Sequence, residues 1–120
     1  MKTIGTLFGT ALLAVTVMIG AGATPVSAHP SIDIVASNWK FTPSTITVHV
    51  NELTTLRVTS RGGVHGIQSD ELGISDTTIV PEKFQAVTFT PKKIGTFTVH
   101  CSVVCGAGHA DMALMVKVVE

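Results

Sequence analysis

Apolar and polar residues alternate with a period of two through much of this chain, and this pattern limits its possible folds more than any other feature. Ile46 and Val48 alternate with threonines and His49. The alternation recurs at four further places: Leu56 with Val58, Val87 with Phe89, Phe97 with Val99, and Leu114 with Val116 and Val118. Strands with one apolar face must bury it against a second layer. The sequence therefore predicts an all-β domain of five or more short strands.

Glycine and proline separate these segments, at Pro43, Gly62-Gly63, Gly73, Pro81, Pro91 and Gly95. Such residues permit a turn or interrupt a strand ladder. Almost no segment has the pattern of a helix. Short strands joined by turns in fewer than a hundred residues indicate a β-sandwich or a small barrel.

The first 28 residues have the layout of an export signal, because Lys2 precedes an apolar stretch from Ile4 to Gly20. The small-residue pattern Val26-Ser27-Ala28 follows and is typical of a cleavage site. We expect residues 1–28 to be a signal peptide and residues 29–120 to be one domain. The domain is then exported to the periplasm or the extracellular space.

Two alternatives concern the same segment. Ala21-Gly22-Ala23 is a second cleavage pattern, and Ile4 to Ala23 is about long enough for an uncleaved membrane anchor. Gly5, Gly9 and Gly20 interrupt that stretch and disfavour the anchor, so we expect no stable membrane span after cleavage. Without Lys2, seven Lys and Arg face eight Asp and Glu. No basic field indicates nucleic acid as a partner.

Four sulfur and imidazole side chains gather near the carboxyl end with the spacing C-x3-C-x3-H-x2-M: Cys101, Cys105, His109 and Met112. Soft sulfur and imidazole ligands favour copper, whereas calcium and magnesium need oxygen ligands that this stretch mostly lacks. The alternative for two cysteines in an exported chain is a disulfide.

The same spacing would also place the four side chains on one face of a helix. Gly106 and Gly108 disfavour a helix, as do the β-branched Val103 and Val104. We therefore predict a loop between two strands, in which the glycines let the backbone pass close to a metal ion. A further ligand must come from elsewhere, and the loop around Gly62-Gly63 offers His65. His49 and His100 lie on the polar side of their strands and are expected to be solvated.

These residues resemble the CuA domain of cytochrome c oxidase subunit II, a cupredoxin, and the similar copper domain of nitrous oxide reductase. The resemblance rests on the motif from Cys101 to Met112 preceded by His65. It extends through Glu71-Leu72-Gly73-Ile74, Pro81 and Gly95 with Phe97, over roughly residues 45–120. It implies a cupredoxin-like Greek-key β-sandwich or barrel and a centre of two copper ions.

The family pattern also implies a role for each residue. Cys101 and Cys105 would bridge the two coppers through their sulfurs. One copper would take His65 and Met112, and the other would take His109 and the main-chain carbonyl of Val103.

Three departures put membership of a large oxidase complex in doubt. Val103 stands where oxidase subunits commonly have a glutamate that helps to hold a second metal. The pair of membrane helices that precedes the domain in an oxidase is absent from this sequence. There is no tyrosine, and Trp39 is the one tryptophan, so the aromatic cluster through which electrons usually enter is thin.

The function that the sequence favours is a non-catalytic electron carrier with redox partners such as a c-type cytochrome or a terminal oxidase. No residue set indicates a nucleophile with its base. The alternatives are a periplasmic copper carrier or assembly factor, a detached part of a respiratory enzyme, and a mononuclear cupredoxin using one cysteine.

Overall fold

The computed structural model describes residues 29–120 together with Gly5, Gly9, residues 13–16 and Gly20. The predicted signal peptide, residues 1–28, therefore lies largely outside the described residues and stays a prediction. Among the residues that are described, no helix is long and apolar enough to span a bilayer.

Nine strands form two sheets in the described part of the chain, which confirms the all-β prediction. Sheet I has the order β2-β1-β4-β7 and consists of β1 (Ser31–Ser37), β2 (Lys40–Thr42), β4 (Thr54–Ser60) and β7 (Gln85–Phe89). Sheet II has the order β3-β9-β8-β5-β6 and consists of β3 (Thr45–His49), β5 (His65–Ser69), β6 (Ile74–Ile79), β8 (Gly95–His100) and β9 (Ala113–Val119).

The chain crosses repeatedly between the two sheets, which gives a Greek-key sandwich. It leaves sheet I after β4, enters sheet II at β5, and returns to sheet I for β7 alone before β8. Strands β1 and β4 pair in parallel, as do β3 and β9, whereas β8 and β9 form an antiparallel pair. Such crossings let the two apolar faces cover one another.

The alternating residues form the core between the sheets, as their period predicts. Ile46 and Val48 are buried in β3, and Leu56 and Val58 are fully buried in β4. Strand β1 was not predicted, although Ile34 and Ala36 alternate there and are fully buried. Strand β5 was also not predicted, because four of its five residues are buried and the period of two is lost.

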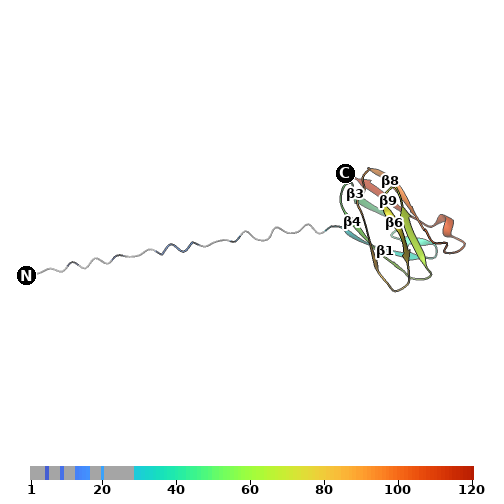
Figure 1. Cartoon of the computed structure of the whole chain (residues 1–120), viewed down its shortest axis with the longest axis horizontal. Helices are drawn as coiled ribbons and strands as arrows, with labels where there is room; N and C mark the ends of the chain where they lie inside the picture. Colours follow the sequence, from blue (N-terminus) through green and yellow to red (C-terminus); the bar gives the residue numbers. More distant parts are fainter. Residues whose placement is uncertain (1–4, 6–8, 10–12, 17–19, 21–28) are drawn as a thin grey trace, which may run out of the picture.

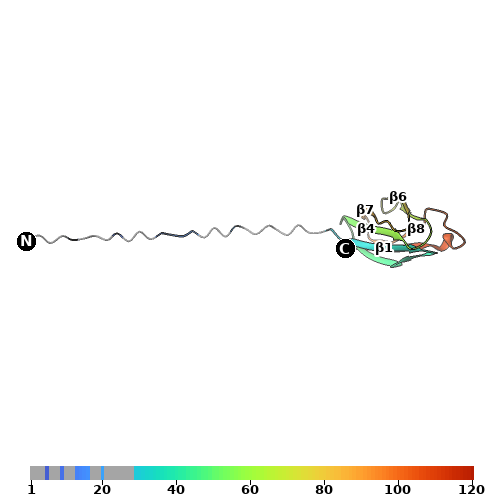
Figure 2. The same ribbon diagram turned by 90° about the horizontal axis from the view of Figure 1, so that it is seen from below.

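The segment from Cys101 to Met112, here called the metal loop, connects β8 to β9. Its one helical element is the single 3-10 turn η1 (His109–Asp111), so the prediction of a loop is correct. A hydrogen bond from the Cys101 N–H to the Met112 carbonyl, at 3.2 Å, closes the neck of the loop. Figure 1 shows η1 at the end of the sandwich opposite the carboxyl terminus, and the turned view agrees (Figure 2). We call this the metal end.

Trp39, in the turn between β1 and β2, packs against the metal loop. Its indole Nε1 donates a hydrogen bond to the Cys105 carbonyl at 3.1 Å. A Cβ added to Gly106 would lie 2.9 Å from Trp39 Nε1, and one added to Gly108 would lie 2.5 Å from Trp39 Cγ. The loop glycines therefore make room for the indole. Their predicted role, a close approach of the backbone to a metal ion, stays a prediction. Trp39 is too distant in sequence for local spacing to reveal this contact.

We predict that Gly108→Ala displaces the Trp39 ring and lowers the free energy of unfolding by about 1–3 kcal/mol, a typical cost of overpacking. The backbone of Gly108 has φ −92°, which alanine can adopt, so the cost comes from the collision alone. Because Trp39 is the one tryptophan, its fluorescence reports on the site directly. The emission should move to longer wavelength as the ring gains contact with water.

Gly62→Ala is the matched control, because an added Cβ there meets nothing within 4 Å. Its emission should equal that of the parent protein, with stability within about 0.5 kcal/mol. Equal spectra for the parent and Gly108→Ala would contradict the packing of Trp39 on the loop.

Candidate metal centre

The antiparallel register of β5 and β8 brings His65 to the metal loop. Gln68 pairs with His100 at the end of β8. Continuing β5 backwards from Gln68 carries the chain past the metal loop, and the Ser102 N–H donates to the Gly66 carbonyl at 3.3 Å. His65 therefore begins β5 beside the cysteines, and its side chain is fully buried.

Gly66 is needed for this approach of β5 to the loop. A Cβ at Gly66 would collide with the Ser102 hydroxyl and would lie 2.9 Å from a methyl group of Val103. Glycine thus lets the two segments touch. This role of Gly66 was not predicted, and its position directly after His65 was the one hint in the sequence.

Four of the predicted site residues place their sulfur and nitrogen atoms in one cluster, centred on Cys105. The Cys105 sulfur lies 3.5 Å from the Cys101 sulfur, 3.7 Å from His109 Nδ1 and 3.7 Å from the Met112 sulfur. Met112 is fully buried and Cys101 is 5 % exposed, whereas Cys105 and His109 are partly exposed. Both cysteines are free thiols in this structure.

The remaining two predicted site residues also face the cluster. The Cys101 thiol donates a hydrogen bond to the Val103 carbonyl at 3.2 Å, so that oxygen is directed at the sulfurs. The ligand atoms of His65, Cys101 and Cys105 all lie within 4.8 Å of one another and could hold a metal ion. His49 and His100, expected to be solvated, are indeed exposed.

The ring of His65 is held in one orientation by a main-chain oxygen. Its Nε2 lies 2.7 Å from the Gly62 carbonyl, to which it donates. The other ring nitrogen, Nδ1, is buried and has no hydrogen-bond partner among the residues that the structure describes. With the proton on Nε2, Nδ1 carries a lone pair, which is the form of imidazole that binds a metal. An unpartnered buried acceptor is costly, and a metal ion would satisfy it.

Ionisation of the Cys105 thiol is disfavoured in this structure. Burial raises the pKa of the Cys105 thiol, and its hydrogen bond to Cys101 and the charge of Cys101 raise it further. Two thiolates at 3.5 Å repel, so a cation among them is required if both are to be ionised. The donor set of two sulfurs from thiols, one thioether, imidazole nitrogen and one carbonyl suits a soft metal.

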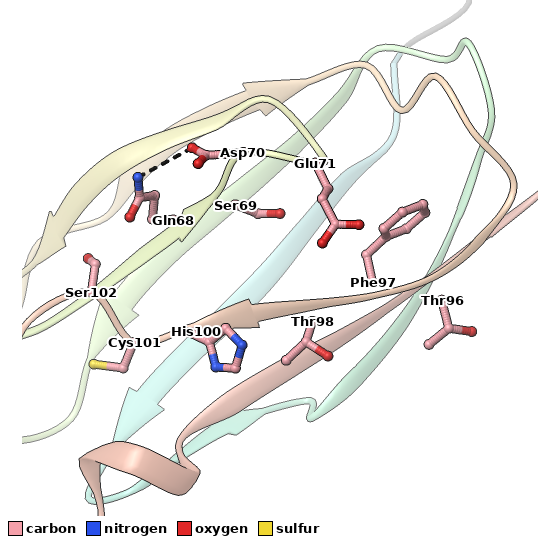
Figure 3. A pocket seen from close by; sticks show the side chains of 10 residues that line it. All are labelled: Gln68, Ser69, Asp70, Glu71, Thr96, Phe97, Thr98, His100, Cys101 and Ser102. Atoms are coloured by element: carbon pink, nitrogen blue, oxygen red, sulfur yellow. Dashed lines mark hydrogen bonds between the residues drawn. The ribbon is translucent and has the colours of Figure 1, made fainter.

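A pocket of about 630 Å³ lies between β5 and β8, next to Cys101. Gln68 and His100 are the paired residues of these two strands, which separate beyond that pair. Asp70 and Glu71 line it together with His100 and Cys101. Figure 3 shows the Cys101 sulfur turned away from the middle of this pocket. The pocket therefore adjoins the sulfur cluster through Cys101 and Ser102.

Comparison with solved structures shows the same fold in oxidase subunits. The periplasmic domain of subunit II of cytochrome oxidase (CoxB) of Bradyrhizobium japonicum is similar at 22 % identity and TM-score 0.68, over 75 % of this chain and 83 % of that one. A chain of a heme-copper terminal oxidase dimer is similar at 21 % identity and TM-score 0.66, over 77 % and 66 %.

A third similar structure is a mixed disulfide intermediate between the thioredoxin-like protein TlpAs and subunit II of cytochrome c oxidase. The match has 19 % identity and TM-score 0.65, over 83 % of this chain and 88 % of that one. At these identities the likeness concerns the fold. No curated protein sequence matches this chain. The model of the cupredoxin-like domain matches residues 9–111, which is most of the sequence, and this chain therefore belongs to the cupredoxin-like domain family.

Proposed function

We propose that this protein is an exported electron carrier that binds two copper ions between Cys101 and Cys105, in a centre of the CuA type. The observation that carries the proposal is the sulfur pair at 3.5 Å, which has imidazole and thioether groups against the Cys105 sulfur. One metal bound by a single thiolate would leave the second thiol buried beside it without a role. Two bridging thiolates use both.

The proposed ligands are the atoms that face the cluster, divided between two coppers as the resemblance to the CuA domain implies. His65, through Nδ1, and Met112 would hold one copper, while His109 and the Val103 carbonyl would hold the other. The unpartnered Nδ1 of His65 supports this residue as a ligand. The direction of the Val103 carbonyl toward the Cys101 sulfur supports this oxygen as another.

Copper held at this site would supply a one-electron couple. The two thiolates nearly balance the charge of two cuprous ions, so loss of an electron adds a single positive charge to the centre. Buried His65 and Met112 keep water from one side of it. Strands β5, β8 and β9 hold the ligands in place, and a site that resists rearrangement favours rapid electron transfer.

The cellular context is proposed from the same chain. Residues 1–28 would direct export and be removed, leaving residues 29–120 in the periplasm or outside the cell. Redox partners would be a c-type cytochrome or a terminal oxidase. The complex of a similar fold with a thioredoxin-like protein supports a further partner, a dithiol protein that keeps Cys101 and Cys105 reduced before copper binds.

A copper carrier is the second candidate, favoured by the partial exposure of Cys105 and His109, through which an ion could leave. Measuring copper per chain after loading and dialysis separates the two functions. An electron carrier of the proposed kind should retain two coppers. One exchangeable cuprous ion would favour the carrier, and one tightly bound copper would favour a mononuclear cupredoxin.

We predict that Cys105→Ser abolishes the sharing of the unpaired electron between two coppers. Electron paramagnetic resonance of the oxidised, copper-loaded parent should show hyperfine splitting from two equivalent copper nuclei. The variant lacks one bridge and should show splitting from a single copper.

Val103→Ala is the matched control in the same loop, because its carbonyl stays and its side chain is not a proposed ligand. This variant should keep the two-copper pattern. The bridging role is wrong if Cys105→Ser still shows two equivalent nuclei.

A further inference from the structure

Exposed apolar side chains from three separate loops gather at the metal end. Trp39 is 42 % exposed, Val64 44 % and Val104 84 %. Trp39 is joined to the metal loop by its hydrogen bond to Cys105, and Gly63 of the Val64 loop lies against Asn38 and the His65 ring. The three side chains therefore belong to neighbouring loops at the metal end. Large apolar groups that share an exposed surface mark a site of protein contact.

Two cations adjoin this apolar surface on the side of sheet I. Lys40 follows Trp39 and pairs with Ser37, and the Arg61 N–H donates to the Ala36 carbonyl at 2.9 Å. Lys40 and Arg61 line a depression of about 320 Å³ together with Val35, Ser37 and Thr42. We call it the Lys40–Arg61 depression.

Neither cation is neutralised by an ion pair. Within residues 29–120 the one salt bridge joins Arg57 to Asp33, so no carboxylate lies within 4.0 Å of Lys40 or Arg61. Glu82 and Lys83 follow Pro81, which bridges to Ser60 at this end, and their charges offset each other. Asp111 in η1 is a further carboxylate of the metal loop. The depression itself carries two positive charges and no negative one.

The pocket beside β8 has the opposite charge. Asp70 and Glu71 line the pocket beside β8 in sheet II, and Figure 3 shows both on the hairpin that faces β8. The Lys40–Arg61 depression on sheet I and this pocket on sheet II therefore carry opposite charges. Local fields of this kind orient a charged partner and raise its rate of association.

We propose that Trp39, Val64, Val104 and the Lys40–Arg61 depression form the docking surface for a redox protein that presents carboxylates beside an apolar contact area. The inference rests on the proposed electron-carrier function and names the chemistry of the partner. The apolar side chains supply contact area over the ligands, and the two cations set the orientation. One electron would pass from the reduced copper centre to the partner, or from the reduced partner to the oxidised centre. No bond is made or broken in this step.

Nuclear magnetic resonance with a redox-inert anion tests the surface without electron transfer. Hexacyanochromate(III) is paramagnetic and broadens the amide signals of residues near which it binds. In the reduced protein, with or without copper, it should broaden the signals around Lys40 and Arg61. Hexaamminechromium(III), a cation, should broaden those around Asp70 and Glu71 instead.

Two double variants with the same change of net charge show where the anion binds. Lys40→Glu combined with Arg61→Glu should abolish the broadening by the anion at the depression. Lys92→Glu combined with Lys93→Glu changes the net charge equally, but these exposed residues lie between β7 and β8, at the end away from the metal loop. This control should keep the broadening at Lys40 and Arg61.

Electron-transfer rates give the second readout. Hexacyanoferrate(III) takes one electron from the reduced, copper-loaded protein and becomes hexacyanoferrate(II). At an ionic strength of about 0.01 M, where screening is weak, the Lys40→Glu/Arg61→Glu variant should react at least about tenfold more slowly than the parent. The Lys92→Glu/Lys93→Glu control should change the rate far less, because its charges lie far from the centre.

The proposal is overturned if the anion broadens the signals around Lys92 and Lys93 as strongly, or if both double variants slow the reaction equally. It is also overturned if the cationic probe binds at the depression. These outcomes are distinct from failure of the proposed function, because the resonance experiment needs no copper. A parent protein without a two-copper spectrum would refute the copper assignment and leave the anion-binding result unaffected.

Discussion

The Cys101 and Cys105 sulfurs lie 3.5 Å apart in the metal loop, and the chemistry of the site depends on this pair. Two thiolates at that distance repel, and in a partly buried site the repulsion is relieved only by protons or by a cation between them. The buried Nδ1 of His65, close to the same sulfurs, has no hydrogen-bond partner among the described residues. A soft cation would relieve the repulsion between the thiolates and would also accept the lone pair of Nδ1. Copper is the metal that the sulfur-rich donor set and the cupredoxin-like family favour together.

The fold supplies the stiffness that such a site needs. The β8–β9 pair closes the neck of the metal loop between Cys101 and Met112, and the register of β5 against β8 sets the position of His65. Trp39 then fills the space that the loop glycines leave and donates to the Cys105 carbonyl. The candidate ligands, which come from a strand, a loop and a 3-10 turn, are thus held in place by contacts within the protein itself.

The alternation of apolar and polar residues predicted several of the strands. The features that were not predicted depend on contacts between segments distant in sequence. Alternation identified strands such as β3 and β9, because a half-exposed strand shows the period of two. It failed at β5, where burial on both faces removes the period, and the chain gives no local indication that His65 begins a strand. The cluster from Cys101 to Met112 was visible as spacing. Its support by Trp39 and Gly66 was not, because those contacts join segments that only the folded topology brings together.

Copper K-edge X-ray absorption of the loaded protein tests the central claim most directly, because it reports which atoms surround each copper. The account predicts sulfur in the nearest shell and a second copper atom as a neighbouring scatterer, since both thiolates bridge the same two ions. A spectrum with sulfur and nitrogen neighbours but no copper–copper contribution would contradict the shared sulfur pair.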